Sequence, residues 1–373
     1  MRCWLPLLLL VGLTACAVSP AGPADPKRPQ QDPPPERPRE VTQPEVPDSE
    51  PELPDGDVIV EPGQTEPPPT RTKTAHPLAK LSTKQLAKML DTNRAALGSA
   101  SLGGTSSGAL FNGVQMPKGT QYKVVNPSQT WGTQETVNNL VKIIRKVNKQ
   151  FPKTLPLRIG DISEKQGAHI PPHHSHQSGR DVDLGFYYTK INRWYTRAHD
   201  GNLDVARTWA LVRAAATETD VEVIFLDRAV QKMLRKHAER IGEASKWLDK
   251  IFGGPTTTLR PLIRHAKGHR THLHVRFYNP IAQETGRRIY RLLINKKLIS
   301  RPTYYIKYRV KRGDTLIRIA RRFKTTVRAI KRANRLRSNR IYTRRKYRIP
   351  RRGGVRQSNK PAVIPERRLP PAP

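Results

Sequence analysis

Histidines and carboxylates gather in two short stretches of the sequence, residues 173–183 and 269–274. Neutral imidazole nitrogens and carboxylate oxygens are ligands that a catalytic zinc accepts, usually three from the protein with one position left for water. The two stretches together offer a full set of such groups: His173, His174, His176, Asp181, Asp183, His269, His272 and His274. A single histidine is more often a surface or hydrogen-bonded core residue, so it is the clustering that predicts a metal site.

The spacing within each stretch predicts which side chains share a face of a strand. Because side chains alternate with a period of two, Asp181 and Asp183 point the same way, and so do His272 and His274. We therefore expect that His274 can bind a metal while His272 stands beside the metal-bound water. His176 lies seven residues before Asp183, a separation that a loop leading into a strand can close.

Cysteines are confined to the start of the chain, at Cys3 and Cys16. No disulfide framework and no cysteine-based zinc site is therefore possible further along. Any metal site must be built from histidine and carboxylate side chains.

Residues 1–16 have the pattern of an export signal, a short apolar run too short to span a bilayer. The run ends in Leu13-Thr14-Ala15-Cys16, which resembles the lipobox of bacterial lipoproteins. The resemblance implies cleavage before Cys16 and lipidation of that cysteine, so that acyl chains hold the protein at a membrane. An ordinary signal peptide with an incidental cysteine is the alternative. Ala17 follows the cysteine, which by the same resemblance favours the outer membrane and a periplasmic location.

The amino-acid composition of the rest of the chain differs from one segment to the next. Residues 17–75 are rich in proline and acidic residues without apolar periodicity, which predicts a disordered tether. The tail over 353–373 is also expected to be disordered.

The formal net charge of +38 indicates an anionic partner: an envelope polymer, a membrane surface or nucleic acid. An export signal puts the chain in the wrong compartment for nucleic acid, so we do not expect that partner.

Residues 76–300 mix helical and strand patterns, which predicts an α+β domain with an antiparallel sheet. A capping box at Ser82 and a cap at Thr133 predict helices after them. Further elements are expected as follows: helices over 205–217 and 228–237, strands over 157–161, 181–188, 221–226 and 272–277, and a loop over 101–108.

Residues 301–352 predict a separate unit of strand, two short helices and strand. Gly313-Asp314-Thr315-Leu316, Ile319-Ala320 and Ile349-Pro350 resemble a lysin-motif (LysM) domain of βααβ type. That resemblance implies binding of polymers that contain N-acetylglucosamine, such as peptidoglycan. The alternative, a basic helical pair that binds nucleic acid, fits the charge but not the motif.

The two histidine stretches resemble penicillin-insensitive murein endopeptidases, a family of the zinc peptidase group that includes lysostaphin-type enzymes and D-alanyl-D-alanine peptidases. The resemblance covers about residues 98–280 and extends to the following segments: Asn112-Gly113-Val114-Gln115-Met116-Pro117, Asn126-Pro127-Ser128, Trp131-Gly132 and Ile159-Gly160-Asp161. Those relatives carry cysteines in this domain and lack the tether and the LysM domain, whereas this chain differs on both points.

The resemblance implies a role for each site residue. His176, Asp183 and His274 would bind Zn²⁺, with His173 left open as a further ligand. His272 would be the catalytic base or transition-state stabiliser, His269 a supporting site residue, and Asp181 a carboxylate that orients a ligand imidazole. The implied reaction is hydrolysis of the D-alanyl–meso-diaminopimelyl cross-bridge of peptidoglycan during cell-wall remodelling.

Two other functions stay open at this point. A zinc D,D-carboxypeptidase or dipeptidase acting on stem peptides would use the same ligands. A non-catalytic wall-binding lipoprotein would need only the anchor and the LysM domain. The oligomeric state is left open by the sequence.

Overall fold

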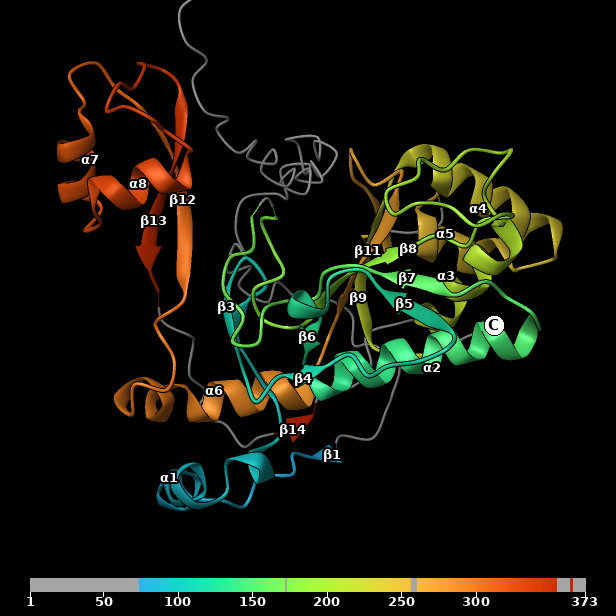
Figure 1. Cartoon of the computed structure of the whole chain (residues 1–373), viewed down its shortest axis with the longest axis horizontal. Helices are drawn as coiled ribbons and strands as arrows, with labels where there is room; N and C mark the ends of the chain where they lie inside the picture. Colours follow the sequence, from blue (N-terminus) through green and yellow to red (C-terminus); the bar gives the residue numbers. More distant parts are fainter. Residues whose placement is uncertain (1–73, 172, 256–259, 354–362, 365–373) are drawn as a thin grey trace, which may run out of the picture. The chain divides into compact units, whose positions relative to one another are not determined.

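The computed structural model describes residues 74–171, 173–255, 260–353 and 363–364 (Figure 1). The predicted export signal, Cys16, most of the predicted tether and most of the predicted tail lie outside the described residues. Among the described helices, none is both long enough and apolar enough to cross a membrane.

Six strands form the central sheet in the order β10-β9-β11-β8-β7-β5. Their bounds are β5 Tyr122–Val124, β7 Leu157–Ile159, β8 Asp181–Gly185, β9 Val221–Leu226, β10 Ile263–His265 and β11 His272–Phe277. The inner pairs β7–β8, β8–β11 and β11–β9 are antiparallel, whereas the edge pairs β5–β7 and β10–β9 are parallel. The α+β class is confirmed, with antiparallel pairing at the centre of the sheet.

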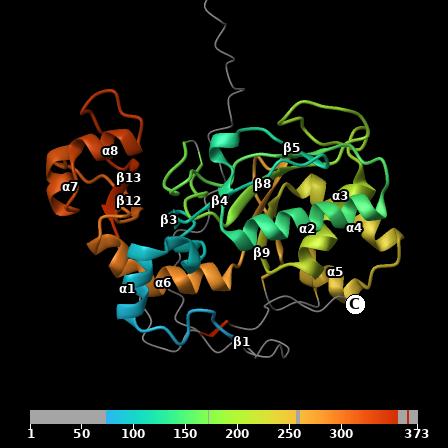
Figure 2. The same ribbon diagram turned by 60° about the horizontal axis from the view of Figure 1, so that its bottom comes forward.

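Four helices pack on this sheet (Figure 2): α2 Gln134–Gln150, α3 Val205–Glu218, α4 Arg228–Arg240 and α5 Ser245–Phe252. The cap predicted at Thr133 is confirmed, because its hydroxyl accepts a hydrogen bond from the amide of Thr136. The predicted helices over 205–217 and 228–237 are α3 and α4. The sequence analysis did not predict α5, which buries Trp247 in the main core.

The prediction of a loop over residues 101–108 is wrong. This segment forms a hairpin of β2 (Ala100–Gly104) and β3 (Ser107–Phe111). Its glycines allow close packing: a Cβ on Gly108 would lie 2.3 Å from the carbonyl oxygen of Gly104. The composition rule failed because these glycines permit close backbone contact within a strand pair, rather than breaking the strands.

A second core lies where this hairpin meets α1 (Thr83–Thr92) and α6 (Pro280–Asn295). The predicted capping box is present in α1, since Ser82 accepts from the amide of Gln85 and Gln85 accepts in return. The remaining short elements are β1 Thr74–Ala75 paired with β14 Val363–Ile364, β4 Val114–Gln115 paired with β6 Trp131–Gly132, and 3-10 helices at Arg94–Leu97 and Pro127–Gln129.

The C-terminal module has the predicted βααβ order. Strands β12 (Thr303–Arg309) and β13 (Lys346–Arg352) pair antiparallel, and α7 (Leu316–Arg322) and α8 (Val327–Ala333) lie between them in the chain. The module has its own small apolar core, which includes Leu316, Ile319, Ile330, Tyr347 and Ile349.

Candidate metal centre

The candidate centre is built on two neighbouring strands, β8 and β11. Their antiparallel register puts Asp183 opposite His274 and Asp181 opposite Arg276. Every residue of β8 is buried, so both faces of this strand lie inside the protein. The register therefore brings a carboxylate from one strand against an imidazole from the other inside the protein.

The loop before β8 supplies His173 and His176. His176 is wholly buried and has a φ of 63°, in the left-handed region that non-glycine residues visit infrequently. Its Nδ1 lies 3.1 Å from the carbonyl oxygen of Ile162, which leaves Nε2 facing the strands. The β2–β3 hairpin supports this loop, because the amide of Gln177 donates to the carbonyl of Thr105 at 2.9 Å.

Three potential ligand atoms meet at close range. The Nδ1 atom of His274 is 3.0 Å from Oδ1 of Asp183 and 3.2 Å from Nε2 of His176. That Nε2 atom is 3.3 Å from the same Asp183 oxygen. Both Asp183 oxygens are buried, and imidazole nitrogens lie within 3.0–3.8 Å of them. Donor atoms held together in this way can bind a cation.

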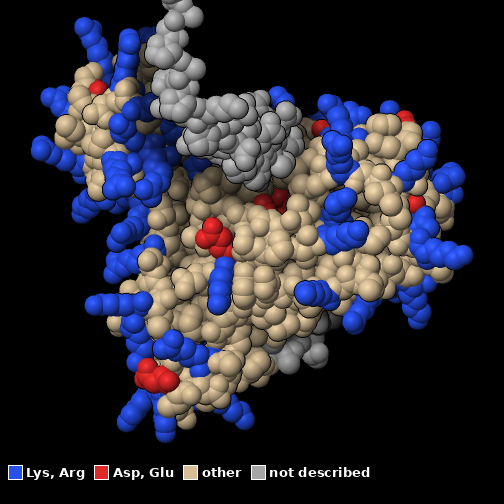
Figure 3. Space-filling model, in the orientation of Figure 1, with Lys and Arg blue, Asp and Glu red and all other residues tan. Residues whose placement is uncertain are grey.

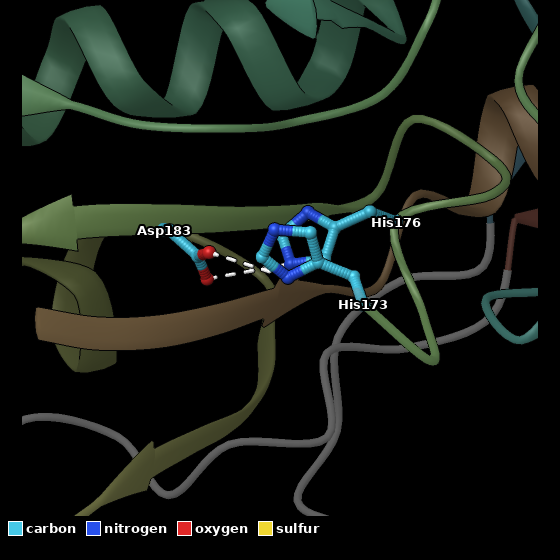
Figure 4. A group of neighbouring side chains, drawn as sticks. All are labelled: His173, His176 and Asp183. Atoms are coloured by element: carbon cyan, nitrogen blue, oxygen red, sulfur yellow. Dashed lines mark ion pairs between the residues drawn. The ribbon is translucent and has the colours of Figure 1, made fainter. Parts of the chain in front are cut away.

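His173 lies beside the same carboxylate, as Figure 4 shows, and the group His173, His176 and Asp183 could hold a metal ion. Its Nδ1 is 3.8 Å from Oδ2 of Asp183, and its Nε2 is 3.1 Å from Oδ2 of Asp161. Since its second nitrogen contacts Asp161 and its distance to Asp183 is longer, His173 lies further from the common meeting point than His274 does.

Asp181 lies behind His274 and not in the ligand group. Its Oδ2 is 3.4 Å from Nε2 of His274, and its carboxylate receives the guanidinium of Arg276, with Nε 2.7 Å from Oδ1. Burial would raise the pKa of Asp181, but Arg276 and His274 hold it well below its usual range. The carboxylate therefore stays ionised and faces the side of His274 that points away from Asp183.

The charges of the centre are strongly coupled. Burial would raise the pKa of Asp183, yet the imidazoles of His176 and His272 hold it well below its ordinary value. Burial would lower the pKa of His274, but the carboxylates of Asp181 and Asp183 raise it to about 9. An ionised carboxylate surrounded by imidazoles is a donor set suited to a divalent cation.

His272 and His269 border the centre. Nε2 of His272 is 3.8 Å from Oδ1 of Asp183, and its Nδ1 is 2.9 Å from the hydroxyl oxygen of Thr271. The ring of His269 lies 4.8 Å from that of His272. All the predicted site residues of the domain thus come together in one place.

Trp194 and Tyr195, which the sequence analysis missed, complete the surroundings of His272. Their rings are centred 6.4 Å and 5.5 Å from its imidazole, and Tyr195 meets it edge-on. Trp194 rests on Gly160, where a Cβ would lie 2.4 Å from the indole. Tyr195 has a φ of 63°, an outlier for a bulky residue. Their sequence neighbours carry no motif, so only the fold reveals this contact.

Comparison with known families supports two assignments. Residues 101–289 match the family described as penicillin-insensitive murein endopeptidase, and residues 308–350 match the LysM domain. A comparison with curated proteins finds no match for the chain.

Proposed function

The chain belongs to the penicillin-insensitive murein endopeptidase family, and we propose that it is a zinc endopeptidase that cleaves D-alanyl–meso-diaminopimelyl cross-bridges. Membership of the family and the LysM match support peptidoglycan hydrolysis. The identity of the metal, the bond that is cleaved and a role in cell-wall remodelling are our proposals.

The observation that supports zinc most directly is the spacing of three ligand atoms. Zinc bonds of roughly 2.0–2.1 Å in a tetrahedron separate neighbouring ligand atoms by roughly 3.3 Å. The distances among Nε2 of His176, Oδ1 of Asp183 and Nδ1 of His274 are 3.0, 3.2 and 3.3 Å. We therefore assign these three residues as the ligands, which leaves a fourth position open. His173, which the geometry keeps nearer to Asp161, would be an additional or alternative ligand.

Zinc at this position would supply Lewis-acid chemistry, polarising the scissile carbonyl and making water a nucleophile near neutral pH. His272 would accept and return the proton, because its imidazole borders the ligands and histidine is the side chain most commonly used for proton transfer near neutral pH. His269 would hold the His272 ring in place. Asp181 would fix the orientation of the His274 imidazole, the usual role of a carboxylate behind a ligand histidine.

The location that we propose is extracytoplasmic. Substrate and LysM ligand would both be peptidoglycan, and a lipid on Cys16 would hold the protein at the periplasmic face of the outer membrane. The anchor rests on the lipobox resemblance alone, since Cys16 lies outside the described residues. Growth with labelled palmitate, followed by isolation of the protein from wild-type and Cys16→Ser cells, tests it.

Digestion of purified crosslinked muropeptides tests the proposed reaction. We expect loss of dimers and gain of monomers, abolished by a chelator and restored by zinc. His176→Ala and Asp183→Ala should each remove both bound zinc and activity. Release of free D-alanine without loss of dimers would instead identify a D,D-carboxypeptidase. Zinc-independent cleavage would overturn the metal assignment, and absence of any hydrolysis by the zinc-loaded chain would favour a wall-binding protein.

A further inference from the structure

The C-terminal module has a charge that binding to a neutral glycan does not require. Residues 301–352 contain 21 lysine and arginine residues and a single acidic residue, Asp314. That one carboxylate is engaged within the module, since it accepts from the Tyr308 hydroxyl at 2.7 Å and from the amide of Lys311 at 2.8 Å. The remaining cations are thus not neutralised by carboxylates of the module itself.

Most of these cations are exposed. The outer sides of α7 and α8 and the turn that follows them present arginines to solvent, among them Arg321, Arg328, Arg332, Arg337 and Arg344. Figure 3 shows the lysine and arginine side chains spread over the visible face of the module that contains α7 and α8. Their density creates a positive potential over the helices of the module, and that potential attracts polyanions.

Arginines also stack on the tyrosine rings of the module. Four of the five tyrosines in the module have a guanidinium over the ring, with centroid distances from 4.3 to 5.8 Å. The closest is Arg348 over Tyr305. Such stacking holds a planar cation on an aromatic face. The planar fork of an arginine matches a carboxylate, so the arginine-rich surface of the module suits an anionic partner.

We infer that this module binds peptidoglycan chiefly through the carboxylates of its stem peptides, and not through the sugars alone. Arginine forks match carboxylates, and crosslinked wall carries a carboxylate on nearly every stem peptide. The inference deepens the proposed function, since it names the chemical group by which the wall-cutting chain holds its substrate. The LysM match favours the wall over lipid or nucleic acid as the polyanion.

Sedimentation with purified peptidoglycan tests the inference on the full chain carrying His176→Ala and Asp183→Ala, so that the polymer stays intact. The probes are untreated peptidoglycan, peptidoglycan whose carboxylates are converted to methylamides, and chitin as a neutral glycan. We expect binding to untreated peptidoglycan to weaken at least about tenfold between low salt and half-molar salt, where screening is strong. Methylamidation should cause a similar loss, and binding to chitin should be weak throughout.

A charge-neutralised variant gives a second, independent measurement. Arg321→Gln/Arg328→Gln/Arg332→Gln removes three exposed charges from α7 and α8, and should weaken binding severalfold. Lys84→Gln/Lys88→Gln/Lys236→Gln removes three exposed charges from α1 and α4 and serves as the matched control. Circular dichroism checks folding, and the salt series on the parent chain does not depend on either variant.

Equal binding to methylamidated and untreated peptidoglycan, or binding unchanged by salt, would overturn the inference. Tighter binding to anionic phospholipid vesicles or to DNA than to peptidoglycan at equal anion concentration would also overturn it. These results are separate from the proposed reaction. A chain that binds wall carboxylates but cleaves nothing would overturn the reaction alone, and a chain that cleaves but binds independently of charge would overturn this inference alone.

Discussion

The guanidinium of Arg276 contacts both oxygens of the Asp181 carboxylate, with Nε 2.7 Å from Oδ1 and Nη2 3.2 Å from Oδ2. The two residues face each other across β8 and β11, and Asp181 in turn lies 3.4 Å from Nε2 of His274. Arg276 is therefore the counter-ion that keeps a buried carboxylate charged behind a proposed ligand. Removing it would leave that carboxylate buried without its compensating cation.

We predict that Arg276→Gln weakens zinc binding by about 10–100-fold, the usual cost of losing support behind a ligand histidine. Competition with a chromophoric chelator measures the affinity. Arg276→Lys should lose less, because it keeps the charge but not the paired contact. Arg264→Gln, on β10, is the control, since Nε of Arg264 donates to the backbone carbonyl of Pro261. Unchanged zinc affinity in Arg276→Gln would contradict this role.

The metal-free protein should lose stability as the pH rises above neutral. The pKa of His274 is about 9 in the folded chain against an ordinary value of 6.5, so between these values the folded state binds a proton that the unfolded state lacks. That contribution is complete below 6.5 and disappears as the pH passes about 9. Burial raises the pKa of Glu135 to about 7. Glu135 therefore releases its proton at a lower pH than His274 does.

Thermal unfolding in the presence of a chelator, measured from about pH 7.5 to pH 9, isolates the His274 contribution. The Tm should fall over this range in the parent chain and much less in His274→Gln. Zinc should reverse the trend, because it competes with the same proton and binds more tightly as the pH rises. A parent Tm that is flat or rising between these pH values would argue against a protonated His274.

The ring of Tyr195 should matter for turnover because it packs edge-on against His272. We predict that Tyr195→Phe keeps kcat nearly intact, whereas Tyr195→Ala lowers kcat by about 10–100-fold through misplacement of the imidazole. Zinc content should stay the same in both variants. A large rise in KM with an unchanged kcat would instead show that the ring contacts substrate and does not position His272.

Gly286 on α6 faces the β2–β3 hairpin so closely that a Cβ would lie 2.2 Å from the carbonyl oxygen of Ser101. An alanine inside a helix normally stabilises it, but here the added methyl must displace backbone. We predict that Gly286→Ala lowers the free energy of unfolding by about 1–3 kcal/mol. Urea denaturation measures it, with Arg291→Ala on the exposed side of α6 as a control expected to be nearly neutral. A stabilised Gly286→Ala would mean that the hairpin packs less tightly.

The sequence carried enough information to predict the strands and the grouping of the histidines. The period of two correctly placed His272 and His274 on one face, because β11 pairs continuously with β8 from His272 to Arg276. The sequence could not give the register between β8 and β11, which places Arg276 opposite Asp181. That pairing depends on tertiary contacts between segments far apart in the chain.

The errors arose where glycine has a tertiary role. Gly103 and Gly108 suggested a loop by composition. They instead allow the β2–β3 hairpin, which supports Gln177 and the loop that carries His173 and His176. In the same way, Gly160 makes room for Trp194. In both places the missing side chain matters because of a neighbour that local sequence does not reveal.

The pairing of β8 with β11 also determines when the centre can first exist. Asp183 and His274 are 91 positions apart in the chain, and α3, α4 and α5 lie between them. A chain made from its N-terminus therefore presents His176 and Asp183 well before their partner strand has been synthesised. Long-range strand pairing is slow because the intervening chain must first be brought together. Assembly of the centre is consequently a late folding event, and a partly made chain lacks a complete hydrolytic site.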